Sequence, residues 1–229
     1  MTKTKRDSYH HGDLRSALIS AAEEIIAAEG VEGFTLRKAA RKAGVSPGAP
    51  THHFGSMAGL LTQVARRSYE ALGKQLAGAA EGLEGNAALR ALTAVYVRFA
   101  RDNTGRFRLM GRTDLIELED DDLRAAVYRA MRPLAAAAAG TRGLGVPTPE
   151  FERLDPRLIA AIAPAHGLAH LATEGRLAAT MRSGEVDAQA QDALVDEVLR
   201  ALWPLRNTDH AERERAICYD FGFLLCLDI

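Results

Sequence analysis

Two pairs of adjacent histidines are the first residues whose chemistry could mark a site: His10–His11 and His52–His53. Imidazole nitrogens bind metal ions, exchange protons and donate hydrogen bonds. Neighbouring residues of a helix point about 100° apart, so two adjacent histidines on a helix do not readily share one metal ion. Neither cysteine nor aspartate stands at a ligand spacing beside His52 and His53. The pattern therefore predicts no metal site at either pair.

A third pair, His166 and His170, has helical spacing, which places both rings on one face of an otherwise apolar segment. A metal site there would need a further ligand, and Glu174 stands one turn beyond the pair. A histidine hydrogen-bonded in the core, and a ligand or dimer-interface role for His166, are the other interpretations. No catalytic set, phosphate-binding glycine loop or metal quartet is present in the sequence, so we expect neither an enzyme nor a bound cofactor.

The composition of the 229 residues is that of a globular helical protein, with 47% hydrophobic and 26% charged residues. Alanine and leucine dominate and no segment is a strong strand candidate, so the predicted fold class is all-α. The two cysteines, Cys218 and Cys226, are too few for a disulfide framework. The N-terminal segment has no apolar core, and no stretch of about 18 apolar residues exists. These features predict a cytoplasmic protein that does not cross a membrane.

Charge is distributed unevenly along the chain. Residues 1–67 contain ten Lys or Arg and six Asp or Glu, whereas the remainder contains 19 and 24. A basic N-terminal third on an acidic body favours a polyanion partner for the first part only.

The N-terminal third also has the pattern of a helix-turn-helix. An apolar stripe from Leu14 to Ile26 predicts a first helix, and Thr35 is a suitable N-cap for a second. Gly44 ends that second helix, and Ser46 is predicted to cap a third, with Pro47 at its first position and Pro50 at its fourth. Small residues between the two short helices allow them to cross closely, as a helix-turn-helix requires.

The rest of the chain is predicted to form longer helices at 57–80, 86–101, 120–139, 156–177 and 187–205, with a loop at 140–151. The expected organisation is a flexible arm at 1–12, a helix-turn-helix domain at 13–56, a larger helical domain at 57–206, and an extension at 207–229. The role of the extension, which is apolar, is not predicted.

Residues 35–54, with the pattern T-L-R-x-x-A-x-x-A-G-V-S-x-G-A-x-x-x-H-F, resemble the DNA-binding signature of the TetR family of bacterial transcriptional regulators. The tract YHHGDLR at 9–15 resembles the entry to the first helix in that family. Further along, the segments RFRLMGRTDL and PAHGLAHLATEGRL also resemble the family locally. The resemblance is specific over about residues 9–67 and rests on the helical layout beyond them.

This resemblance implies a homodimer that binds a pseudo-palindromic operator in double-stranded DNA and is released by a small molecule. It implies that Thr35 caps the second helix and touches phosphate, that Arg37 lies at the groove edge and that His53 binds phosphate. The full set of implied DNA-binding residues is Thr35, Arg37, Lys38, Gly48, Ala49, Thr51, His52 and His53. Thr51 and Met57 depart from the tyrosine and lysine that are common in the family. We expect basic residues of the arm to compensate.

The resemblance also implies that residues 57–206 form an effector-binding and dimerisation domain, with a ligand cavity among its central helices. Its predicted lining is Tyr96, Phe99, Phe107, Met110, Tyr128, His166 and His170. Their character favours an apolar or aromatic effector. The last two predicted helices, 156–177 and 187–205, are the expected dimer interface. The alternative is a helical enzyme or lipid-carrier protein whose N-terminal helices are structural only.

Overall fold

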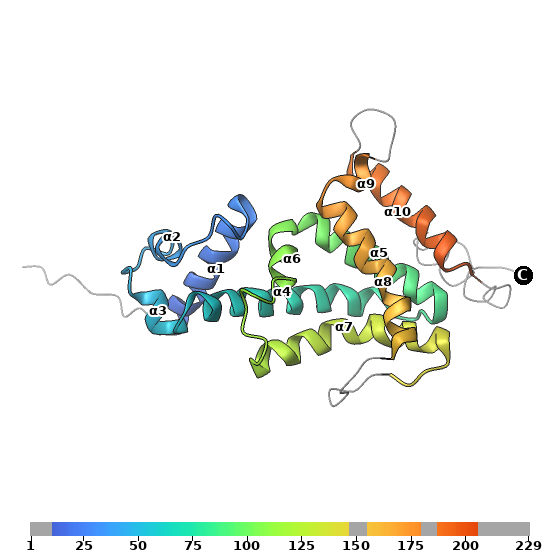
Figure 1. Ribbon diagram of the computed structural model, residues 1–229, viewed down its shortest axis with the longest axis horizontal. Coiled ribbons are helices and arrows are strands. Elements are labelled where there is room, and N and C mark those ends of the chain that lie inside the picture. The colour runs from blue at the N-terminus through green and yellow to red at the C-terminus, as the bar shows by residue number, and fades with distance from the viewer. Residues whose placement is uncertain (1–10, 147–154, 180–186, 206–229) are drawn as a thin grey trace, which may run out of the picture.

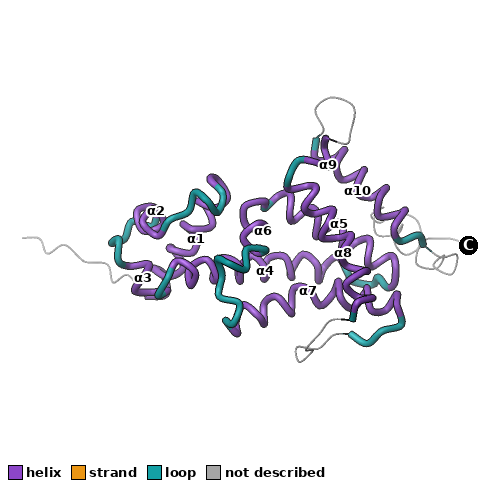
Figure 2. Tube along the Cα trace, in the orientation of Figure 1, coloured by secondary structure: helices purple, strands orange, loops and turns teal. Residues whose placement is uncertain are grey.

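The computed structural model describes residues 11–146, 155–179 and 187–205, and every regular element within these ranges is a helix (Figures 1 and 2). This confirms the predicted all-α class. None of the helices in the described ranges has the length and apolar character needed to span a bilayer. The helices are α1 His11–Glu29, α2 Leu36–Lys42, α3 Ala49–Phe54, α4 Met57–Ala79, α5 Gly85–Asp102, α6 Thr104–Met110, α7 Asp121–Arg142, α8 Pro156–Thr173, α9 Arg176–Ala179 and α10 Ala188–Leu202.

Helices α1 to α3 form a head at one end of the molecule (Figure 1). The predicted N-cap of α2 is confirmed, because the Thr35 hydroxyl accepts a hydrogen bond of 3.2 Å from the Lys38 amide. The predicted arm ends earlier than expected, since α1 already includes His11. Residues 1–10 of the arm, and the predicted extension at 207–229, lie outside the described residues.

The predicted start of the third helix is wrong. Ser46 and Pro47 lie in a turn that is closed by a 3.0 Å hydrogen bond from the Ala49 amide to the Ser46 carbonyl. Helix α3 begins at Ala49, and Gly48 is its N-cap without a side-chain hydrogen bond. Pro50 therefore occupies the second position, where a missing N–H removes no intrahelical bond, and its ring is buried.

Helix α4 connects the head with the helical body and runs alongside α7 (Figures 1 and 2). Its first half buries Leu60, Leu61 and Val64 in one apolar cluster with Ile26 and Phe34 of the head. Its second half contributes Leu72 and Leu76 to a separate cluster formed with α5, α7, α8 and α10. Helix α4 thus belongs to both apolar cores. A change in its tilt within the body would therefore move the head.

Within the body, the predicted helices at 57–80, 86–101 and 120–139 correspond closely to α4, α5 and α7, and the Asp120 carboxylate caps α7 by accepting a hydrogen bond from the Leu123 amide. Three differences are local. Helix α6 forms at Thr104–Met110, where no helix is predicted, and α7 continues through Gly140 to Arg142. The predicted helix 156–177 breaks at Gly175, whose φ of 69° is left-handed, so that α9 is a separate turn. Helix α10 ends at Leu202, before Pro204.

Two glycines allow backbone contacts between the head and the rest of the chain. A Cβ atom on Gly59 of α4 would lie 2.2 Å from the carbonyl oxygen of Phe54, the last residue of α3. A Cβ on Gly105 of α6 would lie 2.3 Å from the carbonyl oxygen of Ile26 in α1. Both distances are shorter than any real Cβ contact, so these two approaches require glycine.

Candidate DNA-binding surface and ligand cavity

The head presents α2, the following turn and α3 at its outer surface. Of the predicted DNA-binding residues, Thr35, Arg37, Gly48, Thr51 and His52 are exposed, while Lys38, Ala49 and His53 are half-buried. Gly48 and Ala49 mark the start of α3, where the backbone carries no bulky side chain. An exposed helix N-terminus with small residues is the geometry with which a helix-turn-helix approaches base edges in a major groove.

The charges on α2 fall into two classes. The Lys38 ammonium group binds the Glu29 carboxylate at 2.5 Å and the Gly33 carbonyl at 2.8 Å, and Lys42 pairs with Glu24 at 2.7 Å. The bond from Lys38 lowers the pKa of Glu29 below its ordinary value. A DNA contact by Lys38 would therefore require this pair to open.

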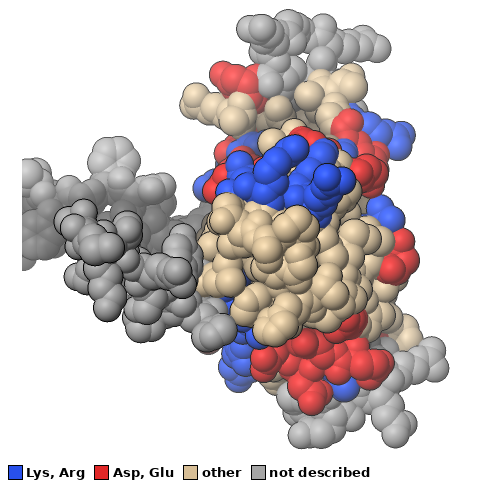
Figure 3. Space-filling view, turned by 90° about the vertical axis from the view of Figure 1, so that its left-hand side faces the viewer, with Lys and Arg blue, Asp and Glu red and all other residues tan. Residues whose placement is uncertain are grey.

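Arg37 and Arg41, by contrast, are exposed, and neither has a carboxylate within 4.0 Å among the described residues. Viewed from the end at which the head lies, the surface has Lys and Arg gathered above a mostly uncharged centre and Asp and Glu gathered below it (Figure 3). The available positive charge of this surface is thus concentrated on one side of α3, where α2 provides two arginines for phosphate contacts.

Replacing Thr35 by aspartate separates its two predicted roles. Aspartate caps a helix at least as well as threonine, so the unfolding free energy should change by less than about 0.5 kcal/mol. A carboxylate beside a DNA phosphate is repelled, so operator affinity should fall at least about tenfold. Thermal unfolding and fluorescence anisotropy on the same samples measure both effects. Unchanged affinity would show that Thr35 does not approach phosphate, whereas Thr35→Ser should retain both properties.

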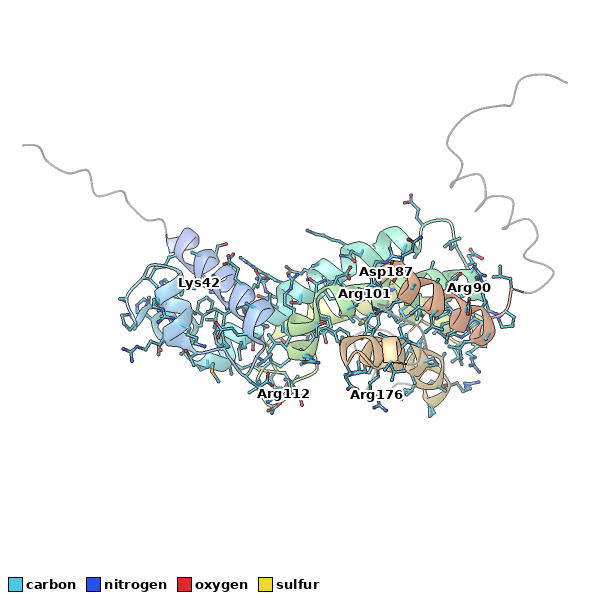
Figure 4. The ribbon with its side chains drawn as sticks, turned by 90° about the horizontal axis from the view of Figure 1, so that it is seen from above. Lys42, Arg90, Arg101, Arg112, Arg176 and Asp187 are labelled. Carbon is cyan, nitrogen blue, oxygen red and sulfur yellow. The ribbon has the colours of Figure 1, made fainter. Side chains whose placement is uncertain are left out.

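The segment between α6 and α7 is bonded to the head at two points. Arg112 donates to Asp114 through two nitrogens, at 2.8 and 2.9 Å, and to Glu32 of the α1–α2 turn at 3.1 Å. The Ser56 hydroxyl, at the start of α4, donates to Glu117 at 3.2 Å. Figure 4 shows Arg112 where the N-terminal helices meet the body. The head is therefore held by directional polar contacts as well as by the apolar core.

A cavity of about 380 Å³ lies at the same junction, and we call it the junction cavity. It opens between the α1–α2 turn, α4, α5, α6 and α8. Its lining residues are Val31, Glu32, Tyr69, Tyr96, Phe107, Arg108, Met110, Gly111, Arg112, His166, His170, Thr173 and Glu174.

Five of the seven predicted pocket residues line the junction cavity: Tyr96, Phe107, Met110, His166 and His170. Phe99 is buried in the body core instead, and Tyr128 of α7 is not part of the lining. The predicted set lacked the residues that come from the head, Val31 and Glu32, and the two arginines of the cavity. Their contribution depends on how the head docks, which local sequence patterns do not reveal.

A hydrogen-bonded chain of three rings forms one wall of this cavity. The Tyr96 hydroxyl lies 3.0 Å from Nδ1 of His166, and Nε2 of His166 lies 3.2 Å from Nε2 of His170. Burial, aided by the nearby Tyr69, raises the pKa of Tyr96, so its hydroxyl remains protonated. Among the described residues, no group of three or more His, Cys, Asp or Glu side chains converges at a metal-binding geometry.

His166 gives the fold a pH dependence. Burial, and then the charge of His170, lower the pKa of His166 below its ordinary value of 6.5. The unfolded chain therefore binds more protons than the folded one near and below pH 6.5, so stability is lost as the pH falls through that value and is retained above it. Urea unfolding at pH 7.5 and 5.5 should show this loss, and His166→Gln should reduce it. An identical pH slope in the variant would contradict the assignment.

A second and larger hollow, of about 570 Å³, lies at the far end of the body between α5, α7 and the α4–α5 turn. Its lining is mostly apolar, and Glu84 is the one charged residue among the described residues that line it. Its size exceeds that of the junction cavity, but it lacks convergent polar groups that would orient a ligand. We therefore regard the junction cavity as the better candidate site.

A helix-turn-helix head on a helical body with a cavity at their junction defines a DNA-binding transcriptional regulator. Residues 18–64 match the family model of the bacterial regulatory proteins of the tetR family. Residues 89–202 match the model of the tetracyclin repressor-like C-terminal domain. The chain belongs to the TetR family of transcriptional regulators, and members of this family are regulators rather than enzymes.

The chain is also similar to individual proteins in sequence or fold. The uncharacterized HTH-type transcriptional regulator YobS of Bacillus subtilis (strain 168) is 29% identical over 96 residues, which are 42% of this chain and about half (50%) of that protein. A protein of unknown function from Rhodococcus sp. RHA1 is 28% identical, with a TM-score of 0.65 over 86% of this chain and 97% of its own. The TetR family regulator PfmR from Thermus thermophilus has the same fold at 19% identity, with a TM-score of 0.56 over 82% and 99% of the chains.

Proposed function

We propose that this protein is a dimeric, cytoplasmic repressor that leaves its pseudo-palindromic operator when a small, largely apolar or aromatic molecule enters the junction cavity. The observation that supports the proposal best is the composition of the cavity wall. Val31 and Glu32 come from the head, whereas Tyr96, Phe107 and His166 come from the body. A ligand that contacts both parts can stabilise one relative position of the head over another, which is the requirement for coupling ligand and DNA binding.

The position of the head depends on what occupies the cavity, because some of the residues that line the cavity also hold the head. Arg112 lines the cavity and also bonds to Glu32 in the α1–α2 turn. Close packing of Gly105 against Ile26 fixes α6 to α1, and α6 supplies Phe107, Arg108 and Met110 to the cavity. A shift of α6 on ligand binding would thus move the head as a rigid unit, and with it the spacing of the two recognition helices in a dimer.

Apolar surface on α8 and α10 supports the homodimer. Ile159 of α8 and Leu202 of α10 are 47% and 42% exposed in the single chain. Exposed alanines accompany both side chains, at positions 160, 163, 193 and 201. Small and apolar residues on two helices allow close packing across a two-fold axis into a four-helix bundle.

Replacing Ile159 by glutamate should separate the protomers, because the two charges would be buried opposite each other in a symmetric interface. Sedimentation equilibrium should show a monomer where the unmodified protein is a dimer. Operator affinity should fall by about 10²- to 10⁴-fold because the second head is lost. Val146→Glu alters a side chain that is similarly exposed, at 43%, but lies outside α8 and α10, and it should leave the dimer intact. A dimeric Ile159→Glu protein would exclude α8 from the interface.

In vitro transcription from the DNA upstream of the protein's own coding region tests repression and release together. The protein should lower the amount of transcript, and small molecules extracted from protein purified from its native cells should restore it. Stimulated transcription, or repression that no such extract reverses, would contradict the corresponding half of the proposal. Mass spectrometry of the active extract would identify the effector.

A further inference from the structure

The junction cavity holds one positive charge that no carboxylate compensates. The Arg108 guanidinium donates to the Thr173 carbonyl at 3.0 Å, and within the described ranges no acidic group lies within 4.0 Å of it. Arg112, the other arginine of the cavity, is neutralised by Asp114 and Glu32.

The acidic residues of the cavity, in contrast, are already paired. Glu32 binds Arg112 at 3.1 Å, and Glu174 lies 3.8 Å from Arg176, which Figure 4 shows with Arg112. A cationic ligand would compete with the arginine that already lies beside each of these exposed carboxylates, whereas an anionic ligand would meet a guanidinium without a carboxylate partner. The charges of the cavity therefore favour an anion over a cation.

The ring chain can supply a second donor to the same cavity, which both Arg108 and His170 line. Two proton orders satisfy these contacts, because a tyrosine hydroxyl both donates and accepts and each imidazole has two tautomers. In one of them Tyr96 donates to Nδ1 of His166, and His166 donates from Nε2 to Nε2 of His170. A neutral His170 must then carry its proton on Nδ1, which is left as an N–H donor. In this order each proton shared by two rings has an acceptor. The Nδ1–H of His170, at the end of the three rings, is then the group that can donate to a ligand.

The remaining wall suits a flat ring. Phe107 packs edge-to-face on Tyr96 with ring centroids 5.6 Å apart, and it lies at 5.6 Å from His170 and 6.1 Å from His166. Such a cluster offers aromatic faces and edges to a ring system of matching size, and Met110 adapts to its outline.

We propose that the effector of the junction cavity is a small aromatic acid whose anionic group binds Arg108 and the His170 N–H, with its ring against Phe107 and Tyr96. This inference rests on the proposed function, in which the junction cavity is the effector site, and it adds the chemical class of the ligand. The acid group supplies orientation through charge-assisted hydrogen bonds, and the ring supplies buried apolar area.

Three probes of similar outline test the charge: 2-naphthylacetate, its neutral and isosteric amide 2-naphthylacetamide, and the slightly smaller cation 2-(2-naphthyl)ethylamine. Titration of the full chain, followed by naphthalene fluorescence, should show the acid binding about tenfold more tightly than the amide. The amine should bind least. Equal binding of the three, tighter binding of the amine, or no binding of the acid would overturn the proposal.

Arg108→Gln should abolish the preference for the acid over the amide, and Arg108→Lys should retain most of it. Arg98→Gln removes an exposed arginine of α5 that pairs with Asp192 outside the cavity, and should leave the preference unchanged. A preference that persists in Arg108→Gln would exclude Arg108 as the anchor. Thermal unfolding of each variant establishes that it is folded.

Operator binding in the presence of the probes distinguishes the two proposals. Release by the amine or the amide, but not by the acid, would refute the acidic class and leave the proposed repressor intact. Failure to bind any operator in the absence of probes would refute the proposed function itself, whatever the probes do.

Discussion

Replacing Gly59 by alanine is expected to destabilise the protein by about 3 kcal/mol and to lower operator affinity at least about tenfold. The added Cβ would lie 2.2 Å from the Phe54 carbonyl oxygen, and backbone at the end of a packed helix cannot move away alone. The start of α4 must therefore separate from the end of α3, which changes the angle at which α3 is presented. Urea unfolding and fluorescence anisotropy measure the two effects.

Gly78→Ala provides the matched control on the same helix. No heavy atom lies within 4 Å of the place its Cβ would occupy. Alanine also costs less backbone entropy than glycine in a helix, so stability should be unchanged or raised by up to about 1 kcal/mol. Equal tolerance of the two substitutions would show that α3 and α4 are not held as closely as the geometry indicates.

The second large effect is expected from the double substitution of Arg37 and Arg41 by glutamine. Both arginines are exposed on α2 without a carboxylate within 4.0 Å among the described residues, so their charge is available to phosphates. Operator affinity near physiological salt should fall about 100-fold, and the slope of log K against log salt should decrease by about two. Anisotropy titrations at four salt concentrations give both quantities.

Replacing Lys38 and Lys42 by glutamine removes the same number of positive charges from the same helix. These lysines are already paired with Glu29 and Glu24, so the loss of affinity should stay below about tenfold. The unfolding free energy should change slightly, because both pairs are largely exposed. Equal losses of affinity in the two double variants would mean that only the net charge of the head matters.

Much of this fold could be predicted because caps and apolar periodicity depend only on residues close together in the sequence. A threonine before an alternation of small and basic residues is sufficient to place the N-cap of α2, and a long apolar periodicity is sufficient for α4 and α5. The start of α3 was predicted wrongly because both Pro47 and Pro50 satisfy the rule for an early helical proline. The choice between them depends on which ring the rest of the head buries, and that ring belongs to Pro50.

The break at Gly175 and the contents of the cavity were missed for related reasons. A single glycine in a helical pattern costs only about 1 kcal/mol, so the pattern continues across it unless tertiary structure requires a left-handed residue there. The partners of Arg108 and Arg112 are 65 and 80 residues away in sequence, at Thr173 and Glu32. No spacing rule connects residues so far apart, and the pairing of charges in the cavity is visible only once the chain is folded.

The most direct test of the DNA-binding account is a titration of promoter fragments with the protein at fixed salt, beginning with the DNA upstream of its own coding region. One fragment should bind at least about 10³-fold more tightly than a scrambled fragment of equal length and composition. Footprinting on that fragment should show two protected half-sites about one helical turn apart. Equal affinity for every fragment, without a protected pair of half-sites, would contradict the role of α3 as a sequence-recognising helix.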